Sequence, residues 1–425
     1  MTSQTRLKYH AARAWQKELP LEHRIFLIAL ITKRKLNGAE RSNDRLTYPN
    51  FNESTMRLES RLHLPEQSQH KQLTLLCIGS LPPPLGGVTV LFQQLCRDLS
   101  DRRDVICRVQ SLPLGPKTAL NRITRMTQTI AGSIWKLPGT DMITLHVPTA
   151  LVPWLGLVML MISRLTRKGL VIRKFAGTDY NALDRISARL ARFVVRHADL
   201  YLAESKALVA IAKRDNARLV EWFPNNRPLD RSNVPVVHNR SCCRFIFVGH
   251  VKPTKGVVEL IEAARMLPEC CSVDIYGPFH DGLTESVFHD QPRVRYCGIV
   301  QPEEVVATME RYDALVLPTY HDGEGYPGVI HEAYLAGRPV IVSRWGCLSE
   351  LVDETSGIFV EPRNSLSLAE AMIRLNMSTE LFRSLQEGAQ AKARFFDSRA
   401  WAERFVEFCL AARYARDQGG DRPRQ

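Results

Sequence analysis

Residues 324–341 read EGYPGVIHEAYLAGRPVI, and this segment is the most informative feature of the chain. Two acids, Glu324 and Glu332, stand on either side of a Gly-Pro-Gly turn that begins a short amphipathic helix. Gly337 and Pro339 end that helix, because neither residue favours its continuation, and an apolar strand follows at 340–342. A helix enclosed in this way between a loop and a buried strand is typical of an α/β domain with a parallel sheet.

The turn at 325–329 predicts an anion-binding site. Backbone N–H groups at the start of a helix lack partners within the helix and carry partial positive charge, so a phosphate binds there. Glu324, in the loop, can accept hydrogen bonds from hydroxyls beyond the phosphate, and Glu332 can reach a second polyol. A nucleotide sugar has this layout: sugar hydroxyls, diphosphate and ribose hydroxyls. The alternative interpretation is a pair of solvated glutamates.

Other runs in the C-terminal half share the order and spacing of a known family. They are FVGHVKPTKG at 247–256, VDIYG at 273–277, VRYCG at 294–298, YDALVLP at 312–318, LSE at 348–350 and GIFV at 357–360. Together with residues 324–341, they resemble the retaining glycosyltransferases of family 4, also called glycosyl transferases group 1. The resemblance extends over about residues 73–395 and is strongest from residue 244 onward.

The resemblance implies an α/β fold of the GT-B type, in which two Rossmann-like, doubly wound parallel-sheet domains face a cleft. The alternation of apolar strands and helices after residue 73 agrees with it, and the run WFPNNRP at 222–228 breaks regular structure between the halves. The expected divisions are an N-terminal extension at 1–72, an acceptor domain at 73–228, a nucleotide-sugar donor domain at 229–397, and at 398–425 a helix packing back on the N-terminal domain plus a tail.

Transfer from a nucleotide sugar places negative charge on the departing diphosphate, and Lys255 resembles the lysine that stabilises it in the family. The family usually has arginine where this chain has His250, which cannot offer a permanent forked charge; Lys252 nearby can compensate. With Glu324 and Lys255, the resemblance implies a third catalytic residue, His146, which orients the donor sugar. The remaining donor-binding residues that it implies are Gly86, Gly87, Gly277, Gly298, Gly325, Tyr326, Pro327, Gly328, Val329 and Glu332.

Position in the expected sheet supports several of these assignments. His146 ends a predicted strand, at the carboxyl edge where open α/β sheets bind ligands, and Gly86 and Gly87 follow the first strand. Lys174 and the loop that includes Asp179 end the next strand and are candidates for contact with the acceptor. Each has an ordinary alternative: a core histidine, a simple turn, or a solvated loop.

Several motifs are absent from the sequence, and the absences limit the chemistry. The chain has no Asp-x-Asp, no Gly-x-x-x-x-Gly-Lys-Ser/Thr and no Gly-x-Ser-x-Gly. We therefore expect metal-independent transfer with no cofactor besides the nucleoside diphosphate sugar, which is a co-substrate. Ten cysteines show no Cys-x-x-Cys pair, so we expect reduced thiols and no zinc site.

Charge is unevenly distributed along the chain. Residues 1–240 contain 37 Lys and Arg against 18 Asp and Glu, whereas the whole chain has 57 against 44. The basic half predicts an anionic partner. An apolar run at 150–162 is too short to cross a bilayer, which takes about 20 residues, and basic residues follow it, so it suits burial or shallow insertion at a lipid surface.

These features predict a cytoplasmic enzyme, peripheral at the inner face of the plasma membrane. It would transfer a sugar to a lipid-linked glycan acceptor in cell-surface polysaccharide biosynthesis, with retention implied by the resemblance. No signal peptide is expected, because the apolar run at 26–31 is short. Two alternatives stay open: a nucleotide-sugar epimerase on the same fold, and a basic membrane- or nucleic-acid-binding protein. The second lacks interleaved aromatic residues and leaves the two glutamates unexplained, so no nucleic-acid partner is expected.

Overall fold

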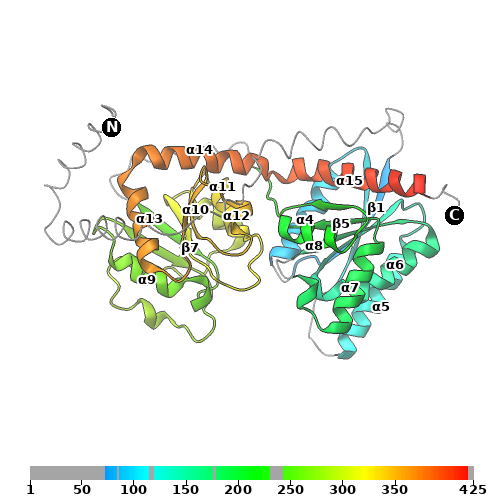
Figure 1. Ribbon diagram of the computed structural model, residues 1–425, viewed down its shortest axis with the longest axis horizontal. Coiled ribbons are helices and arrows are strands. Elements are labelled where there is room, and N and C mark those ends of the chain that lie inside the picture. Colours follow the sequence, from blue (N-terminus) through cyan, green and yellow to red (C-terminus); the bar gives the residue numbers. More distant parts are fainter. Residues whose placement is uncertain (1–71, 84–85, 114–118, 176–178, 230–242, 420–425) are drawn as a thin grey trace. The chain divides into compact units, whose positions relative to one another are not determined.

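The computed structural model describes residues 72–83, 86–113, 119–175, 179–229 and 243–419. The described chain forms two α/β domains, each built on a six-stranded sheet in which every strand pair is parallel (Figure 1). The two predicted doubly wound sheets are therefore confirmed. The expected extension lies outside the described residues, apart from Gln72.

The N-terminal sheet has the strand order β2-β1-β3-β4-β5-β6. Its strands are apolar on both faces, as parallel strands covered by helices must be, and all seven residues of β1 are buried. The elements are β1 (Leu73–Gly79), α4 (Gly87–Ser100), β2 (Val105–Ser111), α5 (Ala119–Trp135), β3 (Met142–Pro148), α6 (Trp154–Thr166), β4 (Gly169–Phe175), α7 (Arg185–His197), β5 (Leu200–Ala203), α8 (Lys206–Arg214) and β6 (Val220–Trp222).

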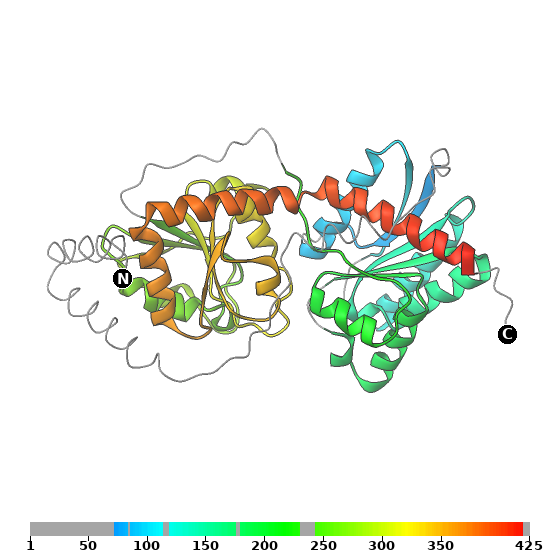
Figure 2. The same cartoon turned by 45° about the horizontal axis from the view of Figure 1, so that its top comes forward.

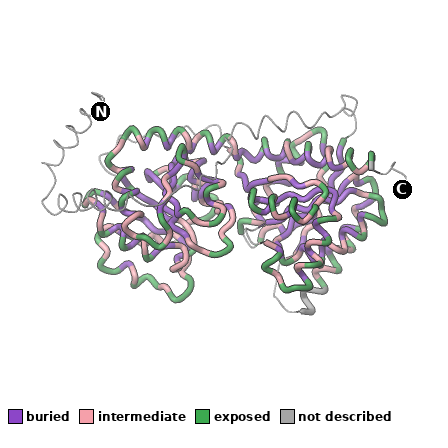
Figure 3. Tube along the Cα trace, in the orientation of Figure 1, coloured by how far each residue is buried: buried purple, intermediate pink, exposed green. Residues whose placement is uncertain are grey.

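The C-terminal sheet has the order β12-β11-β10-β7-β8-β9. Figure 3 shows that the buried residues follow the strands of each sheet, so each domain has its own core. The elements are β7 (Arg244–Val248), α9 (Val257–Arg265), β8 (Ser272–Tyr276), β9 (Val294–Tyr296), α10 (Val305–Met309), β10 (Ala314–Leu317), α11 (Gly328–Leu335), β11 (Val340–Ser343), α12 (Leu348–Leu351), β12 (Gly357–Val360), α13 (Ser365–Met377) and α14 (Thr379–Phe395).

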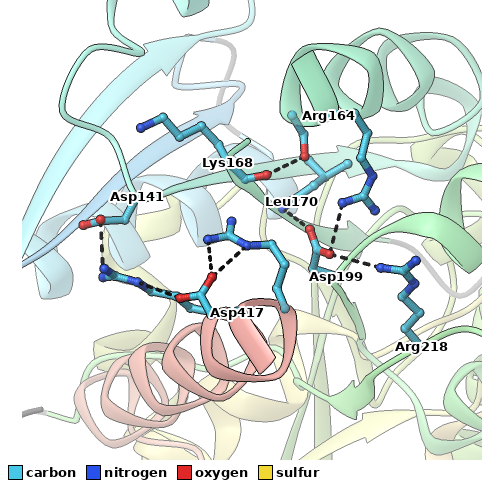
Figure 4. Close-up of polar contacts among 10 residues, drawn as sticks. Asp141, Arg164, Lys168, Leu170, Asp199, Arg218 and Asp417 are labelled. Carbon is cyan, nitrogen blue, oxygen red and sulfur yellow. Dashed lines mark hydrogen bonds and ion pairs between the residues drawn. The ribbon is translucent and has the colours of Figure 1, made fainter. Parts of the chain in front are cut away.

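The last helix, α15 (Ser398–Gly419), packs against α4 and against strands β4 and β5 (Figure 2). An ion pair fixes its C-terminal part: Arg413 Nη1 lies 3.3 Å from Asp141 Oδ1 (Figure 4). The same aspartate accepts a hydrogen bond from the backbone N–H of Thr74 at 2.9 Å. Asp141 therefore ties α15 to the start of the central strand β1.

The apolar run at 150–162 forms a short turn, Thr149–Leu151, and then α6. Leu155, Met159 and Leu160 of α6 are buried, whereas Leu165 is 85% exposed. Among the described residues, no helix is both long enough and apolar enough to cross a membrane.

One expectation about the cysteines is wrong. Cys270 is disulfide-bonded. The other cysteines that the structure describes are free thiols, and Cys77, Cys96, Cys243, Cys271 and Cys409 are buried among core residues.

Candidate functional site

In each sheet the order in which the chain adds strands reverses at one point. The predicted site residues lie near these two points. In the C-terminal domain the chain leaves β7 toward β8 on one side and later returns to β10 on the other. Loops diverge at such a switch point and leave room for a ligand at the carboxyl ends of the strands. Lys255 follows β7 and Glu324 follows β10, so the fold brings them to the same edge.

Lys255 and Glu324 form a close ion pair. The Lys255 ammonium lies 2.5 Å from Glu324 Oε2, and the two side chains are only 16% and 9% exposed. Thr319, also in the loop after β10, donates a hydrogen bond from its hydroxyl to the same carboxylate oxygen at 2.8 Å. The predicted catalytic lysine and glutamate therefore meet, with a threonine that the sequence did not single out.

A glycine permits the two loops to approach this closely. Gly256 has φ +76, and a Cβ placed there would lie 2.1 Å from the backbone oxygen of Pro318. The Tyr320 N–H donates to the Thr254 carbonyl at 2.9 Å and joins the loops directly. Gly256 is therefore required both for its left-handed backbone and for the contact between the loops.

The turn at 325–329 leads into α11, as expected. Pro327 precedes the helix and Gly328 is its first residue, so the N–H groups at the very start of α11 belong to the turn at 325–329. Arg227, which follows β6, lies against this turn: a Cβ on Gly328 would be 2.3 Å from its Nη2 atom. The lack of a side chain at Gly328 therefore makes room for the arginine.

Tyr326 turns into the protein. It is 4% exposed, and its hydroxyl donates to Glu350 Oε2 at 2.9 Å and accepts from Trp222 Nε1 at 3.2 Å. The Asn225 amide holds the Tyr326 carbonyl at 3.0 Å. In this conformation the Tyr326 side chain braces the turn from within the protein.

Glu332 has a partner that the sequence did not reveal. Arg227 donates to Glu332 Oε1 from Nε at 3.3 Å and from Nη2 at 3.2 Å. The two side chains are 13% and 20% exposed, so this pair lies at the surface of α11 rather than in the core.

Three glycines align at the carboxyl ends of β7, β8 and β9. Gly249 donates to the Tyr276 carbonyl at 3.0 Å, and Gly277 donates to the Gly298 carbonyl at 2.8 Å. A Cβ on Gly277 would lie 1.8 Å from the Gly249 oxygen, so only glycine fits there. His250 follows Gly249, and its ring stacks on His280, which the sequence did not single out, at 4.2 Å between centroids.

The N-terminal sheet has its own switch point, between β1 and β3. Gly86 and Gly87 follow β1, and Gly86 caps α4 through a hydrogen bond from its N–H to the Thr89 hydroxyl at 3.0 Å. Among the residues that the structure describes, a Cβ on Gly87 would meet no atom within 4 Å. The fold itself therefore does not require glycine at position 87.

His146 lies at the end of β3 beneath aromatic rings. Its ring centroid is 5.0 Å from that of Phe92 and 5.7 Å from that of Phe405, and the residue is 1% exposed. Nε2 lies 3.0 Å from the Thr144 hydroxyl, whereas Nδ1 has no hydrogen-bond partner among the described residues. Burial holds the pKa of His146 well below its usual range, and Arg173 lowers it further, so the ring is neutral.

The acceptor candidates are less accessible than the sequence indicated. Lys174 is 1% exposed, and burial lowers its pKa to about 8. Asp179 accepts from the Asn181 amide at 2.7 Å, while Gly177 and Thr178 of the same loop lie outside the described residues. Beside Lys174, the buried Arg173 stacks between the rings of Phe175 and Phe223. The sequence placed Arg173 on a strand, but it did not show that the side chain is buried.

No group of three or more His, Cys, Asp or Glu side chains is arranged to hold a metal ion within the part of the chain that the structure describes.

Comparison with known proteins agrees with this architecture. Residues 242–377 match the family model of glycosyl transferases group 1. A crystal structure of Anabaena HepE in complex with UDP has a TM-score of 0.60 at 17% identity, covering 80% of this chain and all of that one. The fold is GT-B.

Curated relatives match over shorter stretches. An uncharacterized glycosyltransferase of Methanocaldococcus jannaschii is 28% identical over 167 residues, 39% of this chain and 47% of that protein. A putative teichuronic acid biosynthesis glycosyltransferase of Bacillus subtilis is 30% identical over 129 residues, 30% of this chain and 32% of that protein. The chain thus spans a third to a half of the length of these relatives.

Proposed function

We propose that this protein is a retaining glycosyltransferase of family 4 that moves a sugar from a nucleoside diphosphate sugar to a glycan acceptor. One observation carries the proposal: the Lys255–Glu324 pair at the switch point of the C-terminal sheet, beside the start of α11. The Lys255 ammonium, which can bind the diphosphate, and the Glu324 carboxylate, which can bind sugar hydroxyls, are in contact with each other. The family match over residues 242–377 includes both.

The reaction breaks the bond between the anomeric carbon and the diphosphate oxygen, and both electrons leave with the diphosphate. Lys255 and the N–H groups at the start of α11 stabilise that charge, which is largest in the transition state. The acceptor hydroxyl forms the new bond on the face that the diphosphate leaves, and its proton passes to the diphosphate. Glu324 accepts hydrogen bonds from the sugar, Glu332 from the ribose, and the neutral His146 and the Gly86-Gly87 loop complete the donor site. No cofactor or metal is involved.

We further propose that the acceptor is lipid-linked, for cell-surface polysaccharide, and that the enzyme works at the inner face of the plasma membrane. The support is a surface of α6 and α7 on which apolar and basic side chains are both exposed. Its apolar members are Trp154 (49% exposed), Met161 (52%), Leu165 (85%), Ile186 (64%) and Phe193 (47%). Arg185, Arg189 and Arg196 are exposed on α7, and Arg167 is exposed directly after the end of α6. We call these nine residues the α6–α7 surface.

A nucleotide-sugar panel tests the activity. UDP-, GDP-, ADP- and TDP-sugars are screened by thermal shift, since a ligand at 100 times its Kd adds about 2.7 kcal/mol to the stability of the folded state. The binding donor is then incubated, radiolabelled, with membranes, and the anomeric configuration of the product is read by NMR. Label in the lipid extract with a retained configuration is expected. If no donor stabilises the protein, the proposed activity is excluded. If epimerised nucleotide sugar forms without an acceptor, the protein is instead a nucleotide-sugar epimerase.

A further inference from the structure

The loops after β7 and β8 are joined to each other beyond the ends of the sheet. Val251 donates to the Pro278 carbonyl at 2.8 Å, and the His280 N–H donates to the Val251 carbonyl at 3.0 Å. These bonds extend the parallel pairing of β7 and β8 by one bridge, between Val251 and Phe279. The backbone therefore sets His250 and His280 side by side.

The two imidazole rings lie face to face. Their centroids are 4.2 Å apart and their planes differ by 18°. One protonated imidazole stacks favourably on a neutral one, because the ring face attracts the positive charge. Two protonated rings in this arrangement repel each other unless an anion lies beside them.

The surroundings of His250 lower its pKa in the free protein. Burial is the largest cause that lowers its pKa, followed by His280 from the loop after β8, Lys255 and Lys252 from the loop after β7, and His321 from the loop after β10. Glu324, the acid beside this cluster, already pairs with Lys255.

The third histidine of the cluster is engaged differently. The Lys252 ammonium lies 3.4 Å from both ring nitrogens of His321, and the Thr254 hydroxyl lies 3.2 Å from Nδ1. His321 therefore contacts side chains of the loop after β7, whereas His250 and His280 are the members of the cluster that stack on each other.

We propose that the stacked pair of His250 and His280 binds the donor diphosphate and takes up a proton as it does so, in place of a permanently charged arginine. This inference rests on the proposed function, because the diphosphate belongs to the nucleotide sugar. A diphosphate beside Lys255 reverses the local field: its negative charges outweigh the repulsion from Lys252 and Lys255, and the imidazolium form becomes the stable one. His280 is then a further donor-binding residue, contributed by the strand next to the one that carries His250.

The linkage has a definite sign. A base that is neutral in the free protein and protonated in the complex makes binding tighter at low pH, and the affinity falls as the pH rises through the pKa of the complex. One linked proton changes the dissociation constant by at most about tenfold per pH unit.

Calorimetric titration measures the proton directly. The probes are UDP-glucose, GDP-mannose, ADP-glucose and TDP-glucose, whose diphosphates are esterified at both ends and so do not titrate themselves as the terminal phosphate of a free nucleotide does. Each is titrated into the full chain at about pH 6, 7 and 8 in buffers of different ionisation enthalpy, which gives the number of protons bound. For the probe that binds, we expect uptake of up to one proton and about tenfold weaker binding at pH 8 than at pH 6.

Three variants complete the test. His250→Arg supplies a permanent charge, so its binding should lose both the proton uptake and the pH dependence while remaining tight at pH 8. His280→Gln should weaken binding at pH 6 by at least about threefold and reduce the uptake. His289→Gln, at an exposed histidine of the same domain, should behave as the unmodified protein.

The outcomes separate this inference from the proposed function. Binding of a probe without proton uptake, or an unchanged pH dependence in His250→Arg, overturns the histidine pair and leaves the glycosyltransferase standing. Failure of every probe to bind at any of the three pH values overturns both.

Discussion

At the scale of single residues, Lys255 and Glu324 neutralise each other in the free protein. In the proposed reaction the donor exchanges one contact for another: the diphosphate replaces the carboxylate beside Lys255, and sugar hydroxyls replace the ammonium beside Glu324. Both side chains are largely desolvated. A charge left alone at this site is costly, so each partner also holds the other in place before the donor arrives.

We expect Lys255→Ala, Glu324→Gln and Glu332→Gln each to lower sugar transfer by at least about tenfold. Lys255→Ala should act mainly on kcat, because charge on the leaving group is largest in the transition state, and Glu332→Gln mainly on KM. Asp322→Asn changes an exposed acid in the loop that carries Glu324. It is the control and should retain activity. Kinetics on the purified variants decide; normal turnover in all three would exclude this site.

Gly87 and Gly256 make a second prediction because the fold treats them differently. A Cβ at Gly256 would clash with Pro318 on a left-handed backbone, so Gly256→Ala should lower stability by about 1–3 kcal/mol. At Gly87 a Cβ has free space, so Gly87→Ala should leave the melting temperature unchanged and lower transfer only if the donor passes over this loop. Thermal unfolding and transfer assays on both variants measure this. A loss of stability in Gly87→Ala would assign that glycine to the fold.

Residues that neighbour each other in the sequence were predictable from it, and partners from distant segments were not. Lys255 stands in one run with Gly249 and Gly256, so a local pattern was enough. His280 and Arg227 act through contacts with segments far away in the chain, and no local pattern reports such a contact. The sequence also placed Lys174 at a strand end without showing that the side chain is buried.

At the scale of elements, periodicity and apolar runs were sufficient for the strands, because a parallel strand covered on both faces reads as a continuous apolar run. The run at 150–162 shows the limit. It correctly indicated an apolar helix, but not that Arg164 at its end is committed to the fold. Figure 4 shows Arg164 and Arg218 converging on Asp199, at 3.3 and 3.6 Å, and Asp199 is 3% exposed on its side chain.

The α6–α7 surface makes a third prediction. The protein should co-sediment with anionic lipid vesicles at low salt and poorly with neutral ones, because each Lys or Arg near such a surface contributes about 1 kcal/mol within a Debye length of ~8 Å. Replacing Arg185, Arg189 and Arg196 together with Gln should weaken that binding without changing donor affinity. Arg164 is left intact because it pairs with Asp199.

The matched control removes the same charge elsewhere. Arg311, Arg374 and Arg383 are exposed in the C-terminal domain, and their triple Gln variant should sediment as the unmodified protein does. High salt should release the electrostatic part and leave a smaller apolar remainder from residues such as Leu165. An equal loss of vesicle binding in both triple variants would show a general charge effect. If the unmodified protein stays in the supernatant at low salt, the proposal of a lipid-linked acceptor loses its support.

Across the whole molecule, the proposed reaction is divided between two similar α/β domains. The two doubly wound parallel sheets could be anticipated from the resemblance. The strand order that the structure adds explains why residues from separate runs meet, because the loops that follow the central strands come together at a switch point. In the C-terminal domain this gathers Lys255, Glu324 and the stacked histidines. In our proposal, all the positive charge that stabilises the leaving diphosphate comes from side chains and helix N–H groups.

A fourth prediction follows from that assignment. Sugar transfer should survive dialysis against EDTA with kcat and KM unchanged, because Lys255, the histidine pair and the start of α11 supply the positive charge that a divalent ion supplies in other enzymes. The measurement is turnover before and after chelation and after adding back magnesium or manganese. A loss of activity that either ion restores would contradict this account of the leaving group.

The fifth prediction concerns acid stability, to which both domains contribute a buried neutral histidine. Burial lowers the pKa of His331 to about 3, and it holds that of His146 well below the usual value of about 6.5. Below about pH 6.5 the unfolded chain binds protons that the folded chain does not, so the free energy of unfolding falls by up to about 1.4 kcal/mol per pH unit for each histidine. For His331 the loss continues until the pH approaches 3.

Urea unfolding at about pH 7, 6 and 5 should therefore show a steady decline in the free energy of unfolding. His331→Gln should lose one histidine's share of that slope, whereas His289→Gln, at an exposed site, should keep the full slope. An unchanged slope in His331→Gln would mean that His331 becomes protonated within the folded protein.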